Sequence, residues 1–379
     1  MPAPEPLAPG LLSAPFAGTA QPAMLDVLAD LLPEPGRSLS GRDVVVLADG
    51  LGSELLRDHH ALAPTLRRAA EATRTIRTVA PATTATAMTS LLTGAPPVRH
   101  GVLGYTVIDP EHGTALNQLT GDGPRVDPTA WMPLPTLGER SERKAVQVGP
   151  AVHAGSHLTR MAYRGWDFLG HRRGGDRVEA VRTALHRAGR DGLVLLHADD
   201  VDHAGHRHGT RSAPWREALE DLDALLAALL RRLPRGTRLH LTADHGMVDV
   251  EPSARLDPTR VPGVRERIDL MAGESRARWI RCRGGADDAA ELHALLREGL
   301  GDAVLVLSRE EVIAEGVLGP AGEQPAAHVR ARMGDVLLLA RGRTTLIDPT
   351  LPTPRHPEVG VHGSLTPREA RVPLLSLEV

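Results

Sequence analysis

Short apolar runs in this sequence end in aspartate, and two of them continue into histidine. The runs are 44–48, 193–198 and 239–243, and the polar residues after them include Asp49, Asp202, His206, Asp244 and His245. Carboxylates and imidazoles are common ligands of divalent metal ions. An open parallel sheet binds its ligands beyond the carboxyl ends of its strands. The pattern therefore predicts a metal site at those strand ends.

The spacing within two of these segments indicates whether one ion can be shared. Asp202 and His206 are four residues apart, so one helical turn would place both side chains on the same face. Asp244 and His245 are adjacent, and both can face one ion only if the chain turns sharply at Gly246. Each segment is also compatible with an ordinary polar turn after a strand, as is Asp49 before its glycine. Their joint occurrence favours the metal site.

A threonine-rich run, 81–94, follows a predicted strand and is expected to form a helix that ends at Gly94. Thr84 would lie at the N-terminus of that helix. Free N–H groups and the helix dipole favour an anion there, such as a phosphate or an alkoxide. The alternative is that Thr83, Thr84 and Thr86 only cap the helix. Beside a metal site, a threonine hydroxyl in this place is a candidate nucleophile.

The elements that would position these residues alternate between strand-like and helix-like segments. The predicted strands are 43–48, 74–79, 144–149, 192–198 and 237–243, and the predicted helices are 53–70, 84–93, 176–189 and 213–232. A long loop region, 95–140, interrupts the alternation. Such a pattern predicts an α/β fold with a mostly parallel, doubly wound sheet sandwiched by helices.

Changes in composition and in the predicted elements divide the chain into three parts. Residues 1–36, rich in proline and alanine, read as an N-terminal arm with one short helix around 23–32. The catalytic α/β core is predicted over 37–255 plus 335–379, with strand 335–340 rejoining the main sheet. The segment 256–334 is predicted to form a small α/β cap or insertion, with strands 276–283 and 303–307 and helices 287–299 and 308–315.

Composition excludes several classes of function. The formal net charge of −3 provides no basic field for a nucleic-acid polymer. Cys282 is the only cysteine, so an intrachain disulfide is excluded and any metal must rely on His, Asp or Glu. No signal peptide or membrane span is visible, which favours a cytoplasmic protein without a membrane partner. The oligomeric state stays open.

Taken together, these segments resemble the alkaline phosphatase superfamily, and within it the nucleotide pyrophosphatase/phosphodiesterase branch. The resemblance covers roughly 40–255 and 335–365. In chain order the matching pieces are Asp49, the block from Pro81 through Thr84 to Thr93-Gly94, His100-Gly101, Asp202-x-x-x-His206, Asp244-His245-Gly246 and His362-Gly363. Their order and combination are far more specific than any single piece.

The resemblance implies a two-metal site and a covalent mechanism. One zinc would be held by Asp202, His206 and His362. A second would be held by Asp49, Asp244 and His245, with Thr84 as the nucleophile bridging toward it. Manganese is an alternative to zinc, because His and Asp ligands accept both metals. His356 competes with His362 for the last ligand position, and the Gly363-Ser364-Leu365-Thr366-Pro367 sequence favours His362.

The implied activity is hydrolysis of a small phosphoester through a phospho-threonine at Thr84. The chain departs from the branch at Ala87, where an asparagine that binds a phosphate oxygen is expected. Oxygen stabilisation would then depend on the metals, the backbone N–H of Ala85 or the hydroxyl of Thr86. Tyr105 is the first candidate for lining the leaving-group pocket. Its alternative role is packing at the edge of the sheet.

Two further functions remain alternatives to a phosphodiesterase or nucleotide pyrophosphatase. A phosphomonoesterase or phosphonate hydrolase of the same superfamily would keep all six ligands and Thr84 but differ in the pocket. A metal-binding scaffold without turnover is the alternative from another class, supported by Ala87. A scaffold needs no nucleophile, so the retained Thr84 argues against it.

Overall fold

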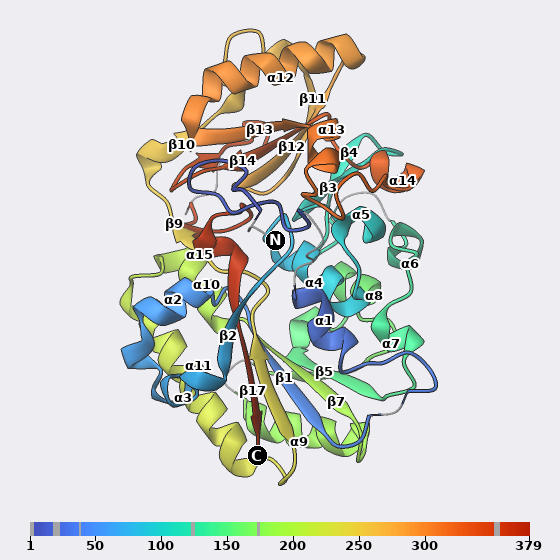
Figure 1. The fold of residues 1–379 in the computed structure, drawn as a ribbon, viewed down its shortest axis with the longest axis vertical. Helices are drawn as coiled ribbons and strands as arrows, with labels where there is room; N and C mark the ends of the chain where they lie inside the picture. Colours follow the sequence, from blue (N-terminus) through green and yellow to red (C-terminus); the bar gives the residue numbers. More distant parts are fainter. Residues whose placement is uncertain (1–3, 18–22, 38, 123–125, 173–174, 352–356) are drawn as a thin grey trace.

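The computed structural model describes residues 4–17, 23–37, 39–122, 126–172, 175–351 and 357–379. Within these residues a seven-stranded sheet runs through the lower part of the molecule in Figure 1, flanked by helices. Its strand order is β2 (Thr73–Arg77), β17 (Arg371–Glu378), β8 (Arg238–Thr242), β1 (Asp43–Ala48), β7 (Leu193–Ala198), β5 (Ala145–Pro150) and β6 (Asp167–His171). The predicted α/β class with a mostly parallel sheet is confirmed.

The central strand β1 fixes the edge at which the polar residues meet. Every residue of β1 is buried, and the strand pairs in parallel with β7 on one side and β8 on the other. The register places Ala48 opposite Ala198, and Leu47 opposite Thr242. The three strands therefore end at the same level, and the residues that follow them emerge side by side.

Two strands of the main sheet were not predicted. β6 forms its outer edge beside β5, and β17 inserts between β8 and β2 and runs antiparallel to both. Pro373 argues against an internal strand because it cannot donate to a ladder. The structure accommodates Pro373 because β8 pairs only with Leu374–Glu378 of β17. Pro373 therefore has a neighbouring strand, β2, on one side only.

Helices cover both faces of the main sheet (Figure 1). α9 (Arg177–Ala188) packs on β5 and β7, whereas α4 (Thr84–Thr93) packs with the arm helix and with α8 on the other face. The remaining helices that bear on the site are α1 (Met24–Ala29), α8 (His157–Ala162), α10 (Asp200–His208) and α11 (Ala213–Arg232). The single helix predicted over 53–70 is wrong. It is divided into α2 (Ser53–Asp58), a short 3-10 turn and α3 (Pro64–Arg68), and Pro64 begins the last piece.

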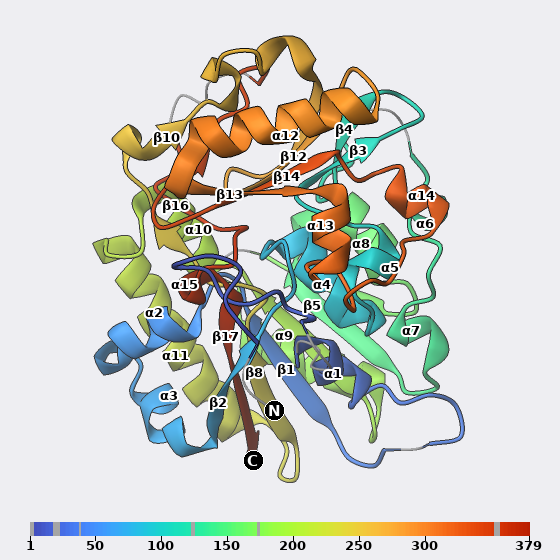
Figure 2. The same cartoon turned by 45° about the horizontal axis from the view of Figure 1, so that its top comes forward.

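A four-stranded antiparallel sheet lies above the main sheet, with α12 (Ala286–Leu300) across it (Figure 2). Its order is β11 (Ile268–Gly273), β12 (Ala277–Cys282), β14 (Val336–Ala340) and β13 (Val304–Ser308). The prediction that strand 335–340 rejoins the main sheet is wrong, because β14 pairs with β12 and β13. Its five residues are all buried, and an apolar run of this kind indicates burial without specifying the sheet.

A buried ion pair joins the small sheet to loops at the edge of the main sheet. The guanidinium of Arg276 donates to both carboxylate oxygens of Glu369, at 2.9 and 2.6 Å, and neither side chain is exposed. Glu369 also accepts the N–H of Ser364 through its carboxylate (3.0 Å) and that of Gly246 through its carbonyl (2.7 Å). The small sheet is therefore fixed to the loops that carry the candidate ligands. In the described part of the chain no helix is both long and apolar enough to cross a bilayer.

Candidate metal centre and nucleophile

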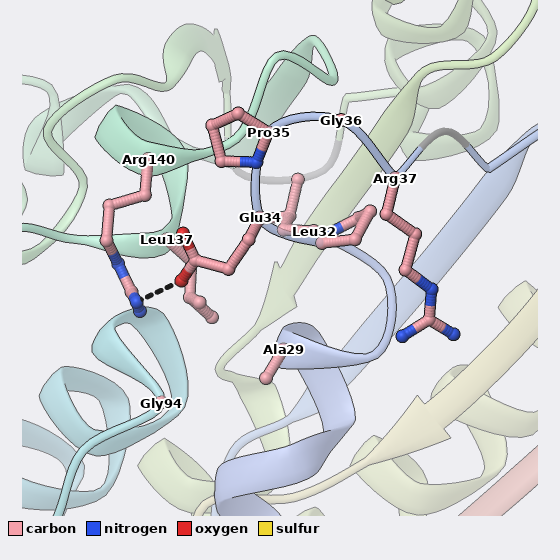
Figure 3. A pocket seen from close by; sticks show the side chains of 10 residues that line it. Ala29, Leu32, Glu34, Pro35, Gly36, Arg37, Gly94, Leu137 and Arg140 are labelled. Atoms are coloured by element: carbon pink, nitrogen blue, oxygen red, sulfur yellow. Dashed lines mark hydrogen bonds and ion pairs between the residues drawn. The ribbon is translucent and has the colours of Figure 1, made fainter.

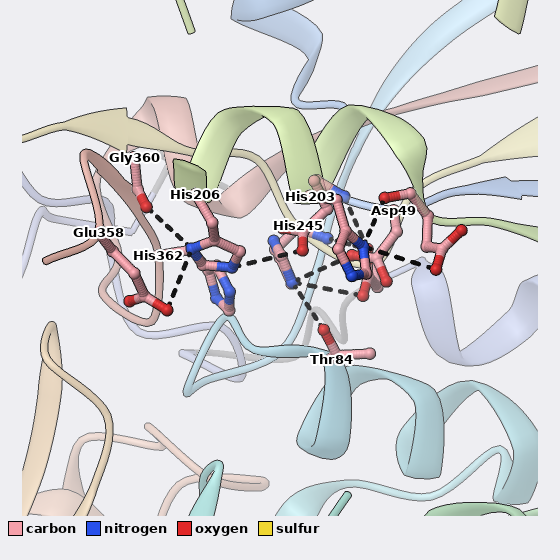
Figure 4. A network of polar contacts seen from close by, with 12 residues as sticks. Asp49, Thr84, His203, His206, His245, Glu358, Gly360 and His362 are labelled. Atoms are coloured by element: carbon pink, nitrogen blue, oxygen red, sulfur yellow. Dashed lines mark hydrogen bonds and ion pairs between the residues drawn. The ribbon is translucent and has the colours of Figure 1, made fainter. Parts of the chain in front are cut away.

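The predicted site residues converge at the carboxyl edge of the main sheet (Figure 4). Thr84 begins α4 below this edge, and α10 lies above it. The candidate ligands come from four segments: Asp49 after β1, Asp202 and His206 on α10, Asp244 and His245 after β8, and His362 after β16 (Gly360–Val361). Asp202 and His206 share one helical face, as their spacing predicts. His356 lies outside the described residues.

The ligating atoms form two overlapping groups. In one, the atoms of Asp202, His206 and His362 lie within 4.8 Å of one another. In the other, Asp49, Asp202 and His245 do so. Asp244 was predicted in this second group, and its Oδ2 lies 3.4 Å from Nε2 of His245. The structure thus brings all six candidates together, and Asp202 belongs to both groups.

The three histidines present the same nitrogen to the centre. Nδ1 of His206 lies 2.9 Å from the carbonyl of Gly360, and Nδ1 of His245 lies 3.0 Å from that of Gly246. Nδ1 of His362 lies 3.0 Å from the carbonyl of Ala82. A carbonyl only accepts, so each Nδ1 carries the proton and each neutral ring keeps a lone pair on Nε2. This is the arrangement of metal-binding histidines whose other nitrogen is held by the backbone.

The carboxylates carry charge that the chain itself leaves uncompensated. Oδ1 of Asp49, Oδ1 of Asp202 and Oδ2 of Asp244 are buried and have no hydrogen-bond partner among the described residues. Burial, followed by the charge of Asp244, raises the pKa of Asp49 and of Asp202 well above the usual range. Unpaired buried carboxylates are unfavourable, and a divalent cation between them would relieve the repulsion. The residues therefore fit a metal centre.

Burial also keeps the imidazoles in the form that binds metal. It lowers the pKa of His245 to about 3, and it lowers the pKa of His362 well below the usual range, with the neighbouring histidines adding to the effect. The two rings are stacked with centroids 3.6 Å apart. Both are neutral near pH 7, as a metal ligand must be.

Thr84 is directed at the centre. Its Oγ1 lies 3.1 Å from Nε2 of His245, and because that nitrogen has no proton the hydroxyl donates. Thr83 is the N-cap residue of α4, yet its side chain makes no capping hydrogen bond. The alternative that these threonines only cap the helix therefore does not describe Thr83 or Thr84. The N–H of Ala85, in the first turn of α4, has no partner within the helix.

Two other predicted positions have different surroundings. Ala87 is fully buried, and its N–H bonds the carbonyl of Thr83 at 2.9 Å. Tyr105 is 38% exposed, accepts a hydrogen bond from Asn117 (2.8 Å) and donates its N–H to Glu274 (2.8 Å). Tyr105 is therefore not packed at an edge of the main sheet. Its role in a leaving-group pocket stays a prediction.

Sequence reasoning missed two polar residues near the centre. Glu274 follows β11 beside Gly363, and burial raises its pKa to about 8. His197 lies within β7, and its Nε2–H donates to Oδ2 of Asp49 at 2.8 Å. The available signal for His197 was a single polar residue in an otherwise apolar run. Asp199 is the N-cap residue of α10 and belongs to neither ligand group.

A surface hollow of about 550 Å³ lies elsewhere on the protein (Figure 3). It is lined by residues that include Gly94, Arg37 and the ion pair between Glu34 and Arg140. Gly94 caps the C-terminus of α4, whereas Thr84 begins that helix. Ten helical residues separate the two by about 15 Å, so this hollow is not part of the candidate centre.

Residues 44–365 match the family described as type I phosphodiesterase / nucleotide pyrophosphatase. The chain belongs to this family. The predicted resemblance to the phosphodiesterase branch of the alkaline phosphatase superfamily is therefore confirmed. The predicted enzyme class, a hydrolase of phosphoester bonds, agrees with the family.

Solved structures of similar fold come from a mammal and a bacterium. Murine ectonucleotide pyrophosphatase / phosphodiesterase 5 superposes with a TM-score of 0.66 and 16% identity, over 87% of each chain. Phosphonoacetate hydrolase from Sinorhizobium meliloti, in complex with phosphonoacetate, superposes with a TM-score of 0.67 and 20% identity. That match covers 91% of this chain and 92% of the hydrolase. Both likenesses concern the fold.

Similarity to curated proteins is confined to parts of them. A phosphopentomutase from Sinorhizobium fredii is 34% identical over 180 residues, which are 46% of this chain and 40% of the mutase. The catalytic subunit of mouse GPI ethanolamine phosphate transferase 3 is 34% identical over 55 residues, 14% of this chain and 5% of the transferase. The matched stretches thus span less than half of either relative.

Proposed function

We propose that this protein is a phosphodiesterase or nucleotide pyrophosphatase that hydrolyses a small, nucleotide-like phosphoester at a two-zinc centre, with Thr84 as the nucleophile. The observation that carries the proposal is the contact between Oγ1 of Thr84 and Nε2 of His245 (3.1 Å) beside buried carboxylate oxygens without partners among the described residues. A hydroxyl that only caps a helix would not be directed at such a group.

The proposed ligands divide as the resemblance implies. Asp202, His206 and His362 would hold one cation. Asp49, Asp244 and His245 would hold the other. Zinc is the first choice and manganese the alternative, because imidazole and carboxylate ligands accept both. When bound, two such cations would stabilise the attacking and leaving oxygens of an in-line displacement and favour the alkoxide of the nucleophile.

The chain's own groups would bind and orient the phosphoryl group. Oγ1 of Thr84 would form the new bond to phosphorus in line with the bond that breaks, and the leaving group would depart as an alcohol or a phosphate. Water would then cleave the phospho-threonine and restore the hydroxyl. The N–H of Ala85 would donate to a non-bridging oxygen, because the N-terminus of α4 favours negative charge. Tyr105 would contact the leaving group.

Ligands bound by two structural relatives support a small phosphorus oxyanion as the substrate. Among the similar structures is an inactive variant of murine ectonucleotide pyrophosphatase / phosphodiesterase 5, with a threonine replaced by alanine, in complex with AMP. The bacterial relative binds phosphonoacetate. Both ligands place a phosphorus-bound oxyanion in the same fold. The substrate proposed here is a phosphoester or phosphoanhydride of a small molecule.

The proposal is tested by comparing substrates on the same purified protein. Bis(p-nitrophenyl) phosphate, p-nitrophenyl phosphate and phosphonoacetate are offered with added zinc or manganese. We expect the diester to be hydrolysed with the highest kcat/KM. A strong preference for the monoester or for phosphonoacetate would replace the proposal with the corresponding alternative from the same superfamily.

The nucleophile is tested with two matched variants. Thr84→Ala removes the hydroxyl and should lower kcat by at least about 1000-fold, or about 4 kcal/mol of barrier. Thr84→Ser keeps a hydroxyl and should retain measurable turnover. Acid quenching of the wild type during turnover of bis(p-nitrophenyl) phosphate should leave a p-nitrophenyl phosphoryl group on Thr84, detectable by mass spectrometry. Undiminished turnover in Thr84→Ala would exclude Thr84, and a metal-loaded protein without turnover on any substrate would favour the scaffold.

A further inference from the structure

His197 is a polar residue inside a buried strand next to β1. The parallel register pairs His197 with Leu47, two residues before Asp49. Residues two apart on a strand share a face, so the side chain of His197 lies on the side toward which Asp49 projects. The side chain of His197 is only 13% exposed. Its position is therefore set by the sheet rather than by a loop.

The two oxygens of Asp49 have different surroundings. Oδ2 accepts the Nε2–H of His197 at 2.8 Å. Oδ1 lies 3.6 Å from Nε2 of His245 and has no hydrogen-bond partner in the part of the chain that the structure describes. His197 thus occupies one oxygen and leaves the other directed at the candidate centre. An unrestrained carboxylate could rotate and offer either oxygen, or both.

We propose that His197 is a positioning residue that holds Asp49 as a single-oxygen ligand of the second cation. This inference rests on the proposed function, because it assigns Asp49 to that cation. The hydrogen bond occupies Oδ2 and fixes the plane of the carboxylate. Hydrogen bonds of this kind to ligating groups commonly change metal affinity by about 10- to 100-fold.

Neighbouring histidines provide matched controls. The ring centroid of His153 lies 6.5 Å from that of His197, and Nδ1 of His203 lies 3.1 Å from the carbonyl of Asp199. Neither is hydrogen-bonded to Asp49. Replacing His153 therefore removes an imidazole of similar location and leaves the carboxylate of Asp49 restrained.

The test measures zinc binding rather than turnover. Full-length protein is stripped with a chelator and titrated with zinc against a chromophoric competitor, and bound zinc is counted by elemental analysis after desalting. The wild type and His153→Gln should bind two equivalents. His197→Leu should keep one tight equivalent and weaken the other by about 10- to 100-fold. His197→Gln, which retains an N–H donor, should restore most of that affinity.

A double-mutant comparison shows whether His197 acts through Asp49. Asp49→Asn should weaken the same equivalent, and adding His197→Leu to it should cause little further loss, because coupled residues are not additive.

If the wild type does not bind two zinc ions, the proposed two-zinc function fails. If the wild type binds two and His197→Leu binds both with unchanged affinity, the positioning role fails and the proposed function stands. If His197→Leu does not fold by circular dichroism, His197→Ala is titrated in its place against His153→Gln, and unchanged affinity for both zinc ions in His197→Ala contradicts the proposal.

Discussion

Two buried aspartates at opposite ends of β1 have opposite electrostatic surroundings. Asp43 begins the strand and accepts hydrogen bonds from Arg143 (2.5 Å), Arg238 (2.6 and 2.7 Å) and His240 (2.8 Å). Burial opposes its charge, yet these three partners together lower its pKa below the usual range. Asp49 follows the strand, and its pKa is raised.

The contrast separates a carboxylate neutralised by the chain from a candidate metal ligand. Asp43 and Asp49 are 0% and 4% exposed, so burial alone does not distinguish them. At the amino edge the chain supplies the positive charge that a buried carboxylate needs. At the carboxyl edge Asp49 has one basic hydrogen-bond partner and two carboxylate neighbours. The missing charge there is what a bound cation would supply.

The largest expected effect is on activity at the carboxyl edge. Asp49→Asn should lower kcat/KM for the diester by about 1000-fold or more, because the second cation would lose a ligand. The same change should alter the stability of the metal-free protein less than Asp43→Asn does, because it removes repulsion by Asp202 and Asp244 together with the favourable contact to His197. Steady-state kinetics and urea unfolding of chelator-treated protein measure the two effects. A large loss of stability in the metal-free Asp49→Asn protein would mean that Asp49, like Asp43, stabilises the fold. The two ends of β1 would then not differ in this respect.

The reciprocal change is expected to act on stability alone. Asp43→Asn should lower the free energy of unfolding by about 3 kcal/mol, because it leaves the largely buried Arg143 and His240 without their carboxylate, whereas the partly exposed Arg238 is screened by solvent. Metal content and kcat/KM per folded molecule should stay at wild-type levels, since Asp43 is at the far end of the strand from the centre. Urea unfolding followed by circular dichroism provides the measurement. Retained stability with lost activity would reverse the assignment.

Zinc should stabilise the protein through the carboxyl edge only. A ligand that binds only the folded state adds about 2.7 kcal/mol at 100 times its dissociation constant. Wild type and Asp43→Asn should both gain stability of this order over their metal-free forms, whereas Asp49→Asn should gain less. Thermal unfolding with and without zinc shows the difference. An equal gain in all three proteins would place the ions elsewhere.

The same contrast shows what the sequence could predict. Asp49, Asp202, Asp244 and their histidines follow apolar runs, and apolar runs identify strand ends without knowledge of strand order. The spacing of Asp202 and His206 also specified a shared helical face. His362 could be placed only by resemblance, because it reaches the centre from the far end of the chain through a bridge between Gly363 and Ala82.

Features that depend on pairing between distant segments could not be predicted. β14 is as apolar as β1, and nothing in its residues indicates that it pairs with β12 rather than with the main sheet. His197 contacts Asp49 because the parallel register pairs it with Leu47, two residues before Asp49. Local sequence identified the candidate ligands that the structure brings together, whereas long-range pairing determines which other polar residues contact them.

The smallest expected effect is a pH dependence that appears only without metal. The hydrogen bond and charge of Asp49 outweigh burial and raise the pKa of His197 to about 9, above its usual value of 6.5. A raised folded-state pKa contributes stability below the unfolded value, and this contribution is lost as pH rises through the folded value. The metal-free wild type should therefore lose stability between pH 7 and 9, by an amount on the order of 1–2 kcal/mol.

The comparison with His197→Gln, rather than the pH window alone, isolates this residue, because the raised pKa of Glu274, about 8, also makes stability fall within the window. His245 and His362 have lowered pKa values and are neutral in both the folded and unfolded states above pH 7. The lowered pKa of Asp43 gives a contribution of the opposite sign, present above its unfolded value of 3.8 and lost only in stronger acid, so it is constant over this window. Urea unfolding of metal-free protein should show the slope in wild type and Asp43→Asn and a smaller slope in His197→Gln. The same slope in His197→Gln would mean that the pH dependence comes from another group. The contact between His197 and Asp49 would then not balance the charge at the carboxyl end of β1.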